Sequence, residues 1–158
     1  MNRTTPPTPQ QIFGSLVATV LGNALTASGY TLQENPTHQS RGLFRYAKPL
    51  RGGAVDGVVA YAEFQLLYYQ GAPSRFRINL LRNVGADARV HSTYADKVEI
   101  TLSRLLWDVF RIEQLDSPDH WWTFGNQQQL GAGLIEAGKL LIGFGLPWLE
   151  GTLKPEDL

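Results

Sequence analysis

Apolar residues recur at helical spacing near the start of the chain. They form one stripe: Phe13, Leu16, Val17, Val20, Leu21 and Ala24. The residues before the stripe are typical of a helix start, since Thr8 can cap, Pro9 suits the first helical position and Gln11 can complete a capping box. Gly29 is a natural stop. The pattern predicts a helix over residues 9–28.

From residue 30 onward the apolar residues alternate with polar ones, which is the period of a β-strand. The segments YTLQE (30–34) and GLFRYAK (42–48) predict two short strands, with NPTHQS as the turn between them. Segments 58–69 and 74–84 predict a longer antiparallel hairpin, and QGAP is its turn. One set of alternate hairpin residues is apolar and core-like: Val58, Ala60, Ala62, Phe64, Leu66, Tyr68, Phe76, Ile78, Leu80 and Val84.

Two later segments are harder to assign by period. In KVEITLSRLL (97–106) the apolar residues fit both a strand and a helix stripe, and both alternatives stay open over 98–110. The β-branched residues favour a strand first, with a helical turn after Trp107. HWWTF (120–124) predicts a further strand.

A second helix is predicted near the end of the sequence. Asn126 and Gln129 can form a capping box. An apolar stripe follows: Leu130, Leu134, Ala137, Leu141 and Phe144. We expect Gly143, Gly145 and Pro147 to end or kink this helix.

These elements predict an α+β fold. We expect a mostly antiparallel sheet of about six strands, with an N-terminal and a C-terminal helix packed on one face. Residues 1–7 are expected to be a flexible N-terminus, 8–150 a single domain and 151–158 a loose C-terminal tail. The apolar face of the hairpin should then meet both helix stripes.

The composition narrows the classes of partner. Fourteen basic and fourteen acidic residues cancel to a formal net charge of zero, so no overall field attracts nucleic acid or an anionic membrane. The absence of cysteine excludes disulfides and thiolate metal sites. No signal peptide and no run of about eighteen apolar residues is visible. We therefore expect a cytoplasmic protein with no nucleic-acid and no membrane partner.

Known catalytic patterns do not emerge from the sequence. His38, His91 and His120 lie far apart and no His-Glu-x-x-His run exists, so we predict no metal site and no cofactor. There is no Gly-x-Ser-x-Gly elbow, and Ser92 beside His91 would point to the opposite face of a strand. No catalytic residue is predicted, and whether the chain is an enzyme stays open, with the balance against it.

Two groups of residues are candidates for function. The polar side of the predicted hairpin forms a candidate binding face, which consists of Tyr61, Glu63, Gln65, Arg77 and Asn79. A face that mixes aromatic residues, amides and arginines is typical of recognition surfaces. The alternative is a structural network, with a cross-strand ion pair between Glu63 and Arg77. Trp121 and Trp122 form a candidate aromatic edge, one side chain packing inside and the other covering an edge or lining a pocket.

The order of short motifs resembles a bacterial family known as domain of unknown function 4304. The matching pieces are Gly29-Tyr30, Phe44-Arg45, Phe64-Gln65, Phe76-Arg77-Ile78-Asn79, Arg104-Leu105 and Trp121-Trp122. The resemblance implies a small α+β domain and a strand over 98–105. It brings no catalytic residues, and by analogy with other small orphan domains it suggests an immunity-like binder.

Two function hypotheses follow. The first is a non-catalytic module that binds a protein partner through the candidate binding face. The second is a small-molecule or nucleotide binder, which could be an enzyme, that uses the same polar groups in a pocket. A homodimer is also compatible with the sequence.

Overall fold

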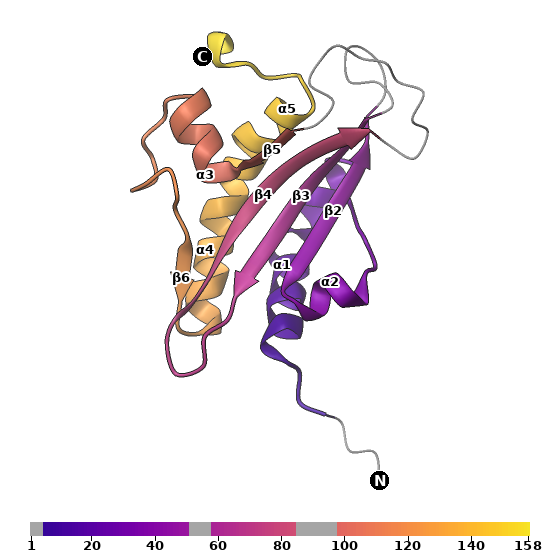
Figure 1. Ribbon diagram of the computed structural model, residues 1–158, viewed down its shortest axis with the longest axis vertical. Coiled ribbons are helices and arrows are strands. Elements are labelled where there is room, and N and C mark those ends of the chain that lie inside the picture. Colours follow the sequence, from indigo (N-terminus) through magenta and orange to yellow (C-terminus); the bar gives the residue numbers. More distant parts are fainter. Residues whose placement is uncertain (1–4, 51–57, 85–97) are drawn as a thin grey trace.

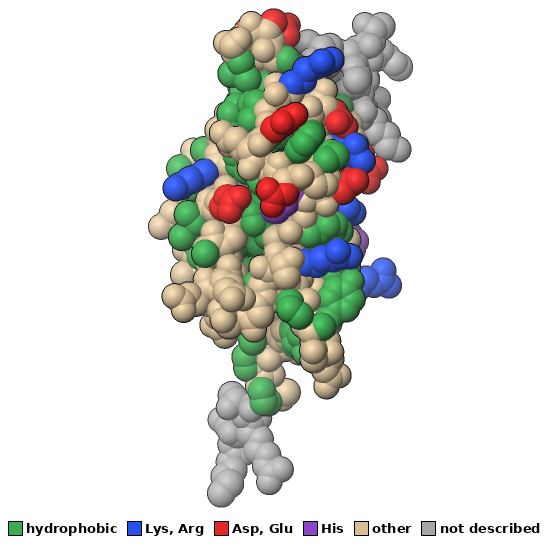
Figure 2. All heavy atoms as spheres, turned by 90° about the vertical axis from the view of Figure 1, so that its left-hand side faces the viewer, with side chains coloured by type: hydrophobic (Ala, Val, Ile, Leu, Met, Phe, Trp, Pro, Cys, Tyr) green, Lys and Arg blue, Asp and Glu red, His purple; other side chains and the backbone are tan. Residues whose placement is uncertain are grey.

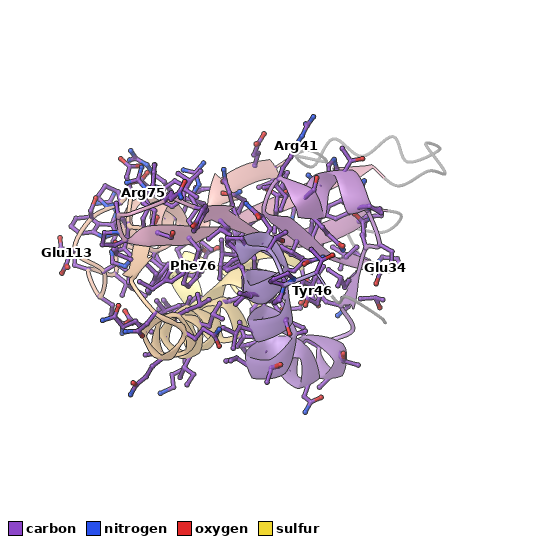
Figure 3. The ribbon with its side chains drawn as sticks, turned by 90° about the horizontal axis from the view of Figure 1, so that it is seen from below. Glu34, Arg41, Tyr46, Arg75, Phe76 and Glu113 are labelled. Carbon is purple, nitrogen blue, oxygen red and sulfur yellow. The ribbon has the colours of Figure 1, made fainter. Side chains whose placement is uncertain are left out.

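The computed structural model describes residues 5–50, 58–84 and 98–158. Within these residues a six-stranded antiparallel sheet carries helices on one of its faces, so the predicted α+β fold is confirmed (Figure 1). Figure 3 shows the two layers from below, with the sheet above and the long helices beneath it. Arg51, Gly52, Gly53, His91 and Ser92 lie outside the described residues.

The first helix, α1 (Pro9–Ala27), begins as the sequence predicts. The backbone N–H of Gln11 donates to Thr8 Oγ1 over 3.1 Å, and the N–H of Thr8 donates to Gln11 Oε1 over 2.9 Å. Gly29 follows with a φ of +92°, a conformation that favours glycine. The buried stripe differs from the prediction at its end: Ala24 is exposed, and Leu25, four residues after Leu21, is buried instead.

Helix α1 packs directly onto strand β2 (Leu43–Pro49) at Gly14. A Cβ added to Gly14 would overlap the ring of Phe44, which is itself buried, whereas a Cβ added to Gly22 on the same helix meets nothing within 4 Å. The absence of a side chain at Gly14 therefore sets the distance between helix and sheet.

The two glycines give a matched prediction. Gly14→Ala is expected to lower the free energy of unfolding by about 1–2 kcal/mol, because Phe44 must move out of a packed site. Gly22→Ala is expected to raise it by about 0.5–1 kcal/mol, because alanine is the better helix former. Equilibrium denaturation in urea measures both values. Equal effects at the two positions would contradict the close contact at Gly14.

The strands are β1 (Thr31–Leu32), β2 (Leu43–Pro49), β3 (Val58–Leu67), β4 (Ser74–Val84), β5 (Val98–Thr101) and β6 (Trp122–Phe124). They lie in the order β1-β2-β3-β4-β5, and β6 pairs with the beginning of β4. Strand β4 is thus bordered by β3 along its whole length and by β5 and β6 at its two ends. Every pair is antiparallel, as predicted for the central hairpin.

The segment predicted as a turn before β2 is a short helix, α2 (Pro36–Ser40). Asn35 caps it by accepting a hydrogen bond from the N–H of His38 over 3.1 Å, and Pro36 occupies the first turn. An asparagine followed by proline is a helix-start signal as well as a turn signal. The turn prediction was therefore wrong.

The ambiguous segment 98–110 is a strand followed by a helix. Strand β5 ends at Thr101, and α3 (Leu102–Arg104) continues into the π-helix η2 (Leu105–Val109). The prediction of a strand up to 105, with a helical turn only after Trp107, was wrong. The Thr101 hydroxyl accepts a hydrogen bond from the N–H of Arg104 over 3.2 Å, and this cap starts the helix earlier.

The sequence predicted that the last helix ends or kinks at Gly143, Gly145 and Pro147, and the helix continues past them with a change of its turn. Helix α4 (Gln127–Leu140) runs through a π-helix, η3 (Leu141–Gly145), into α5 (Leu146–Leu149), and a 3₁₀ turn, η4 (Pro155–Asp157), lies in the tail. Gly143, Gly145 and Pro147 do not end the helix. The π turn lies where Pro147 lacks the N–H of a regular helical bond, and such widened turns accommodate that loss.

The continuous segment Gln127–Leu149 is the one helix in the described ranges that is long and apolar enough to cross a membrane. Its apolar stripe is buried in the domain: Leu130, Leu134, Ala137 and Leu141. Gly138 lies against Leu21 of α1, and Gly133 lies against Phe76 of β4. The helix therefore packs as a core helix against both α1 and the sheet.

Candidate functional site

The candidate binding face lies on the side of the sheet that the long helices leave uncovered. Alternation along β3 and β4 points Phe64, Phe76 and Ile78 into the core, where each has less than 1% of its surface exposed. In Figure 3 Phe76 lies on the side of the helices and Arg75 on the outer side of the sheet. The residues between the core positions therefore share this outer surface. We call it the polar face, and it contains the candidate binding face of Tyr61, Glu63, Gln65, Arg77 and Asn79.

Strand register brings the predicted residues together. Gln65 lies opposite Arg77, and Glu63 lies opposite Asn79, across β3 and β4. Across β2 and β3, Glu63 also lies opposite Arg45, which was not a predicted site residue. Tyr61 lies opposite Leu81, two residues further along β3. Four of the five predicted face residues thus form two neighbouring cross-strand pairs on this face, and Tyr61 belongs to the next pair on the same face.

Glu63 is the most enclosed of these residues, with 7% of its surface exposed. Its Oε2 accepts hydrogen bonds from Arg45 Nε over 3.0 Å and from Arg45 Nη2 over 2.7 Å. Its Oε1 accepts from Asn79 Nδ2 over 2.9 Å. The expected ion pair between Glu63 and Arg77 is replaced by the pair between Glu63 and Arg45, because the register places a third strand beside Glu63.

Gln65 forms the second half of the network. Its Oε1 accepts a hydrogen bond from Arg77 Nε over 3.0 Å and another from Asn79 Nδ2 over 3.0 Å. Asn79 therefore bridges Glu63 and Gln65. One continuous chain of hydrogen bonds crosses three strands and holds the long side chains in place.

The two adjacent tryptophans point in opposite directions. Trp122 is buried and stacks on Phe76, with ring centroids 5.4 Å apart and an angle of 16° between the rings. Trp121 lies on the polar face, where its ring centroid is 4.5 Å from Arg77 Cζ and 4.7 Å from Arg75 Cζ. Both arginines are within the range of cation–π attraction.

The loop that leads to Trp121 is fixed at several points. Ser103 Oγ donates to the carbonyl of Pro118 over 2.8 Å, and Trp107 Nε1 donates to the carbonyl of Leu115 over 3.1 Å. Arg104 binds Asp119 through two hydrogen bonds of 2.9 and 3.1 Å. Trp121 is thus held by this loop on one side and by the buried Trp122 on the other.

A cleft of about 630 Å³ extends the polar face towards β5 and α3. Polar residues form most of its lining: Glu63, Gln65, Arg77, Asn79, Glu99, Thr101, Arg104, Asp108 and Asp119. Arg104 is neutralised there by Asp119 and, at 3.3 Å, by Asp108. A second hollow of about 590 Å³ lies at the hairpin end, lined mainly by apolar residues together with Tyr68 and Tyr69.

Positive charge is concentrated beside Trp121. Within the described ranges, Arg45, Lys48 and Arg104 each lie within 4.0 Å of a carboxylate, whereas Arg75 and Arg77 do not. In Figure 2, which views the molecule from the left-hand side of Figure 1, basic side chains lie next to hydrophobic ones along the right-hand margin. The polar face therefore combines a neutral network at Glu63 with two uncompensated arginines.

The groups with shifted pKa lie in the interior. Burial raises the pKa of Tyr30 strongly, and the Glu150 carboxylate, which accepts from the Tyr30 hydroxyl over 3.3 Å, raises it further. Glu150 also pairs with Lys48, which ties the end of α5 to β2. Burial likewise raises the pKa of Tyr46, with a smaller effect from Glu34. This cluster joins elements of the scaffold.

No group of three or more potential metal ligands occurs among the residues that the structure describes. His38 lies in the last turn of α2, and the centroid of the His120 ring is 4.6 Å from that of the Trp122 ring. His38 and His120 thus belong to separate parts of the fold.

Arg45, Arg75 and Arg104 were not among the site residues predicted from the sequence. Arg45 and Arg75 alternate with buried residues in the predicted strands, so the period already indicated the polar face. Their role depended on strand register and on the return of the chain at β6, which the local sequence pattern does not reveal.

Comparison with protein-family models, with curated proteins and with solved structures finds no match for this chain. The resemblance to domain of unknown function 4304 stays a prediction.

Proposed function

We propose that this chain is a protein-binding module that holds its partner on the polar face. The observation that carries the proposal is the cluster of Arg75, Arg77 and Trp121 on the sheet. On the same face, Arg45 Cζ lies 5.4 Å from the centroid of the Tyr61 ring. Arginine, tryptophan and tyrosine are the residue types that contribute most binding energy in protein interfaces. Side chains that are already ordered lose little entropy when a partner binds.

The state of Glu63 supports a non-catalytic role. Both of its carboxylate oxygens accept hydrogen bonds, three in all, from Arg45 and Asn79. A general base needs a lone pair within reach of the proton that it removes, and three of the roughly four lone-pair sites of this carboxylate are occupied. The geometry of Glu63 therefore favours a role in joining β2, β3 and β4.

A small polar ligand is the second candidate occupant of the same face. The cleft of about 630 Å³ is within the range of small-molecule sites, which is roughly 300–1,000 Å³. Gln65, Arg77 and Asn79 line it and could orient such a ligand.

We also propose that the protein is bacterial and cytoplasmic. The family resemblance supports the bacterial origin, and the absence of cysteine from the sequence supports the cytoplasmic location.

The test is affinity capture from a native bacterial extract with the wild-type chain and with Gln65→Ala and Arg77→Ala. We expect proteins captured by the wild type to be lost with both variants, because each removes part of the polar face. Hydrogen exchange of the purified complex should show protection in β3 and β4. Lys139→Ala, on the exposed side of α4, is the matched control and should capture the same proteins as the wild type.

Capture that is unchanged by both face variants, or protection confined to the helices, would contradict the proposal. A rise in melting temperature with a nucleotide, sugar or amino acid, abolished by Arg77→Ala and without a protein partner, would favour the small-ligand candidate.

A further inference from the structure

We propose that the partner recognised by the polar face is an extended acidic protein segment, whose carboxylates bind Arg75 and Arg77 beside Trp121. This inference rests on the proposed protein-binding function and names the chemistry of the partner. Four features of the described residues support it: free donors, fixed positions, spacing and the charges around the site.

Both guanidinium groups have donors to offer. Arg77 Nε donates a hydrogen bond to Gln65 Oε1, and the two terminal nitrogens of Arg77 make no hydrogen bond to a described residue. Arg75 makes no hydrogen bond to a described residue, and its Nε is shielded from water, so the two terminal nitrogens are the donors that a partner can reach. A carboxylate can accept two parallel N–H bonds from a guanidinium, a geometry that lysine does not provide.

The two arginines are held before any partner arrives. Trp121 lies within 4.7 Å of both Cζ atoms, and the Tyr69 ring centroid is 5.9 Å from Arg75 Cζ. The hydrogen bond that Arg77 Nε donates to Gln65 Oε1 fixes the base of the Arg77 guanidinium. Because the aromatic rings and Gln65 restrict the rotamers, binding requires little further ordering.

The spacing of the arginines selects an extended segment. Arg75 and Arg77 are alternate residues of β4 and point to the same face, so their Cα atoms are about 6.6 Å apart. Alternate side chains of an extended peptide have the same separation. Two acidic residues with one residue between them can therefore each meet one arginine.

The surrounding charges favour a short acidic peptide over a nucleic acid. Glu99, Asp108 and Asp119 line the adjoining cleft, and Arg104 is already engaged by the two aspartates. A nucleic-acid backbone carries a phosphate at every nucleotide and would extend over these carboxylates. A peptide can place neutral residues there.

The inference is tested with defined probes by fluorescence anisotropy. The first probe is a labelled heptapeptide with glutamate at alternate positions between threonines, and the second replaces every glutamate by glutamine. We expect the glutamate peptide to bind the full chain at least about tenfold more tightly, and the affinity to fall as salt is added. In ¹⁵N NMR the indole N–H of Trp121 should shift during the titration.

Substitutions at the two arginines test whether they bind the glutamate peptide. Arg75→Gln and Arg77→Gln are each expected to weaken the glutamate peptide about tenfold. Arg75→Lys and Arg77→Lys keep the charge and the aliphatic stem, and they should retain only part of the affinity because lysine lacks the forked geometry. Lys139→Gln removes a cation from the exposed side of α4 and should change the affinity by less than about twofold. Far-ultraviolet circular dichroism verifies that each variant is folded.

Equal affinity for the two peptides, or unchanged affinity in folded Arg75→Gln and Arg77→Gln variants, would overturn the inference. Tighter binding of a labelled oligothymidylate of equal length would assign the arginines to nucleic acid and overturn it as well. If captured proteins still depend on Gln65 and Arg77 while acidic peptides fail, only the acidic partner is wrong. If capture does not depend on those residues, the protein-binding proposal itself fails.

Discussion

Phe76→Ala is expected to lower the free energy of unfolding by about 3–5 kcal/mol, as the removal of a large, fully buried aromatic ring usually does. Phe76 joins three parts of the fold. Its ring stacks on Trp122 of β6, lies 5.8 Å from the Phe13 ring of α1, and is close to Gly133 of α4. Since small domains are stable by only about 5–15 kcal/mol in total, this loss would bring the chain near its limit. Equilibrium unfolding in guanidinium chloride measures it.

Two controls separate burial from simple truncation. Phe76→Leu keeps most of the volume and should cost less than about 1.5 kcal/mol. Ile135→Ala removes an apolar side chain from α4 that is 50% exposed, and it should change stability by less than about 0.5 kcal/mol. A loss below about 1 kcal/mol for Phe76→Ala would contradict the packing of α1, α4 and β6 around one ring.

The interior of this fold could be predicted because its signals are local. The capping box at Thr8 and the apolar stripe after it define α1, and strict alternation defines β3 and β4 with Phe64, Phe76 and Ile78 inward. These features depend only on neighbours along the chain. The errors at α2 and α3 were also local: at Asn35 a cap was taken as a turn signal, and at Thr101 β-branched residues outweighed a cap.

The polar face could be predicted only in part, because its partners come from distant segments. The alternation located Gln65, Arg77 and Asn79 on one side, but the loop between β3 and β4 did not fix their register. Glu63 pairs with Arg45 because β2 lies on the far side of β3. Trp121 reaches Arg75 and Arg77 because β6 returns to the free edge of β4. Neither long-range pairing has a signal in the local pattern.

Glu63→Ala is expected to lower the free energy of unfolding by about 2–3 kcal/mol. The substitution leaves the Arg45 guanidinium and the Asn79 amide without their shared acceptor, and breaking such an enclosed pair costs more than the pair contributes. The Arg45 side chain is 27% exposed, so water can solvate it in part and the cost stays below that of a fully buried pair. Urea denaturation at neutral pH measures the change.

The matched variants test whether the network or the charge alone is responsible. Glu63→Gln retains an acceptor for Asn79 and should cost about 1 kcal/mol, whereas Glu99→Ala, an exposed carboxylate on β5 in the same cleft, should change stability by less than about 0.5 kcal/mol. A double-mutant cycle between Glu63 and Arg45 should give a coupling of at least about 1 kcal/mol. If Glu63→Ala and Glu99→Ala were equal, the carboxylate would not hold the strands together. Because Arg75, Arg77 and Trp121 touch neither oxygen of Glu63, a stability loss with unchanged peptide binding would separate the scaffold of the polar face from its recognition groups.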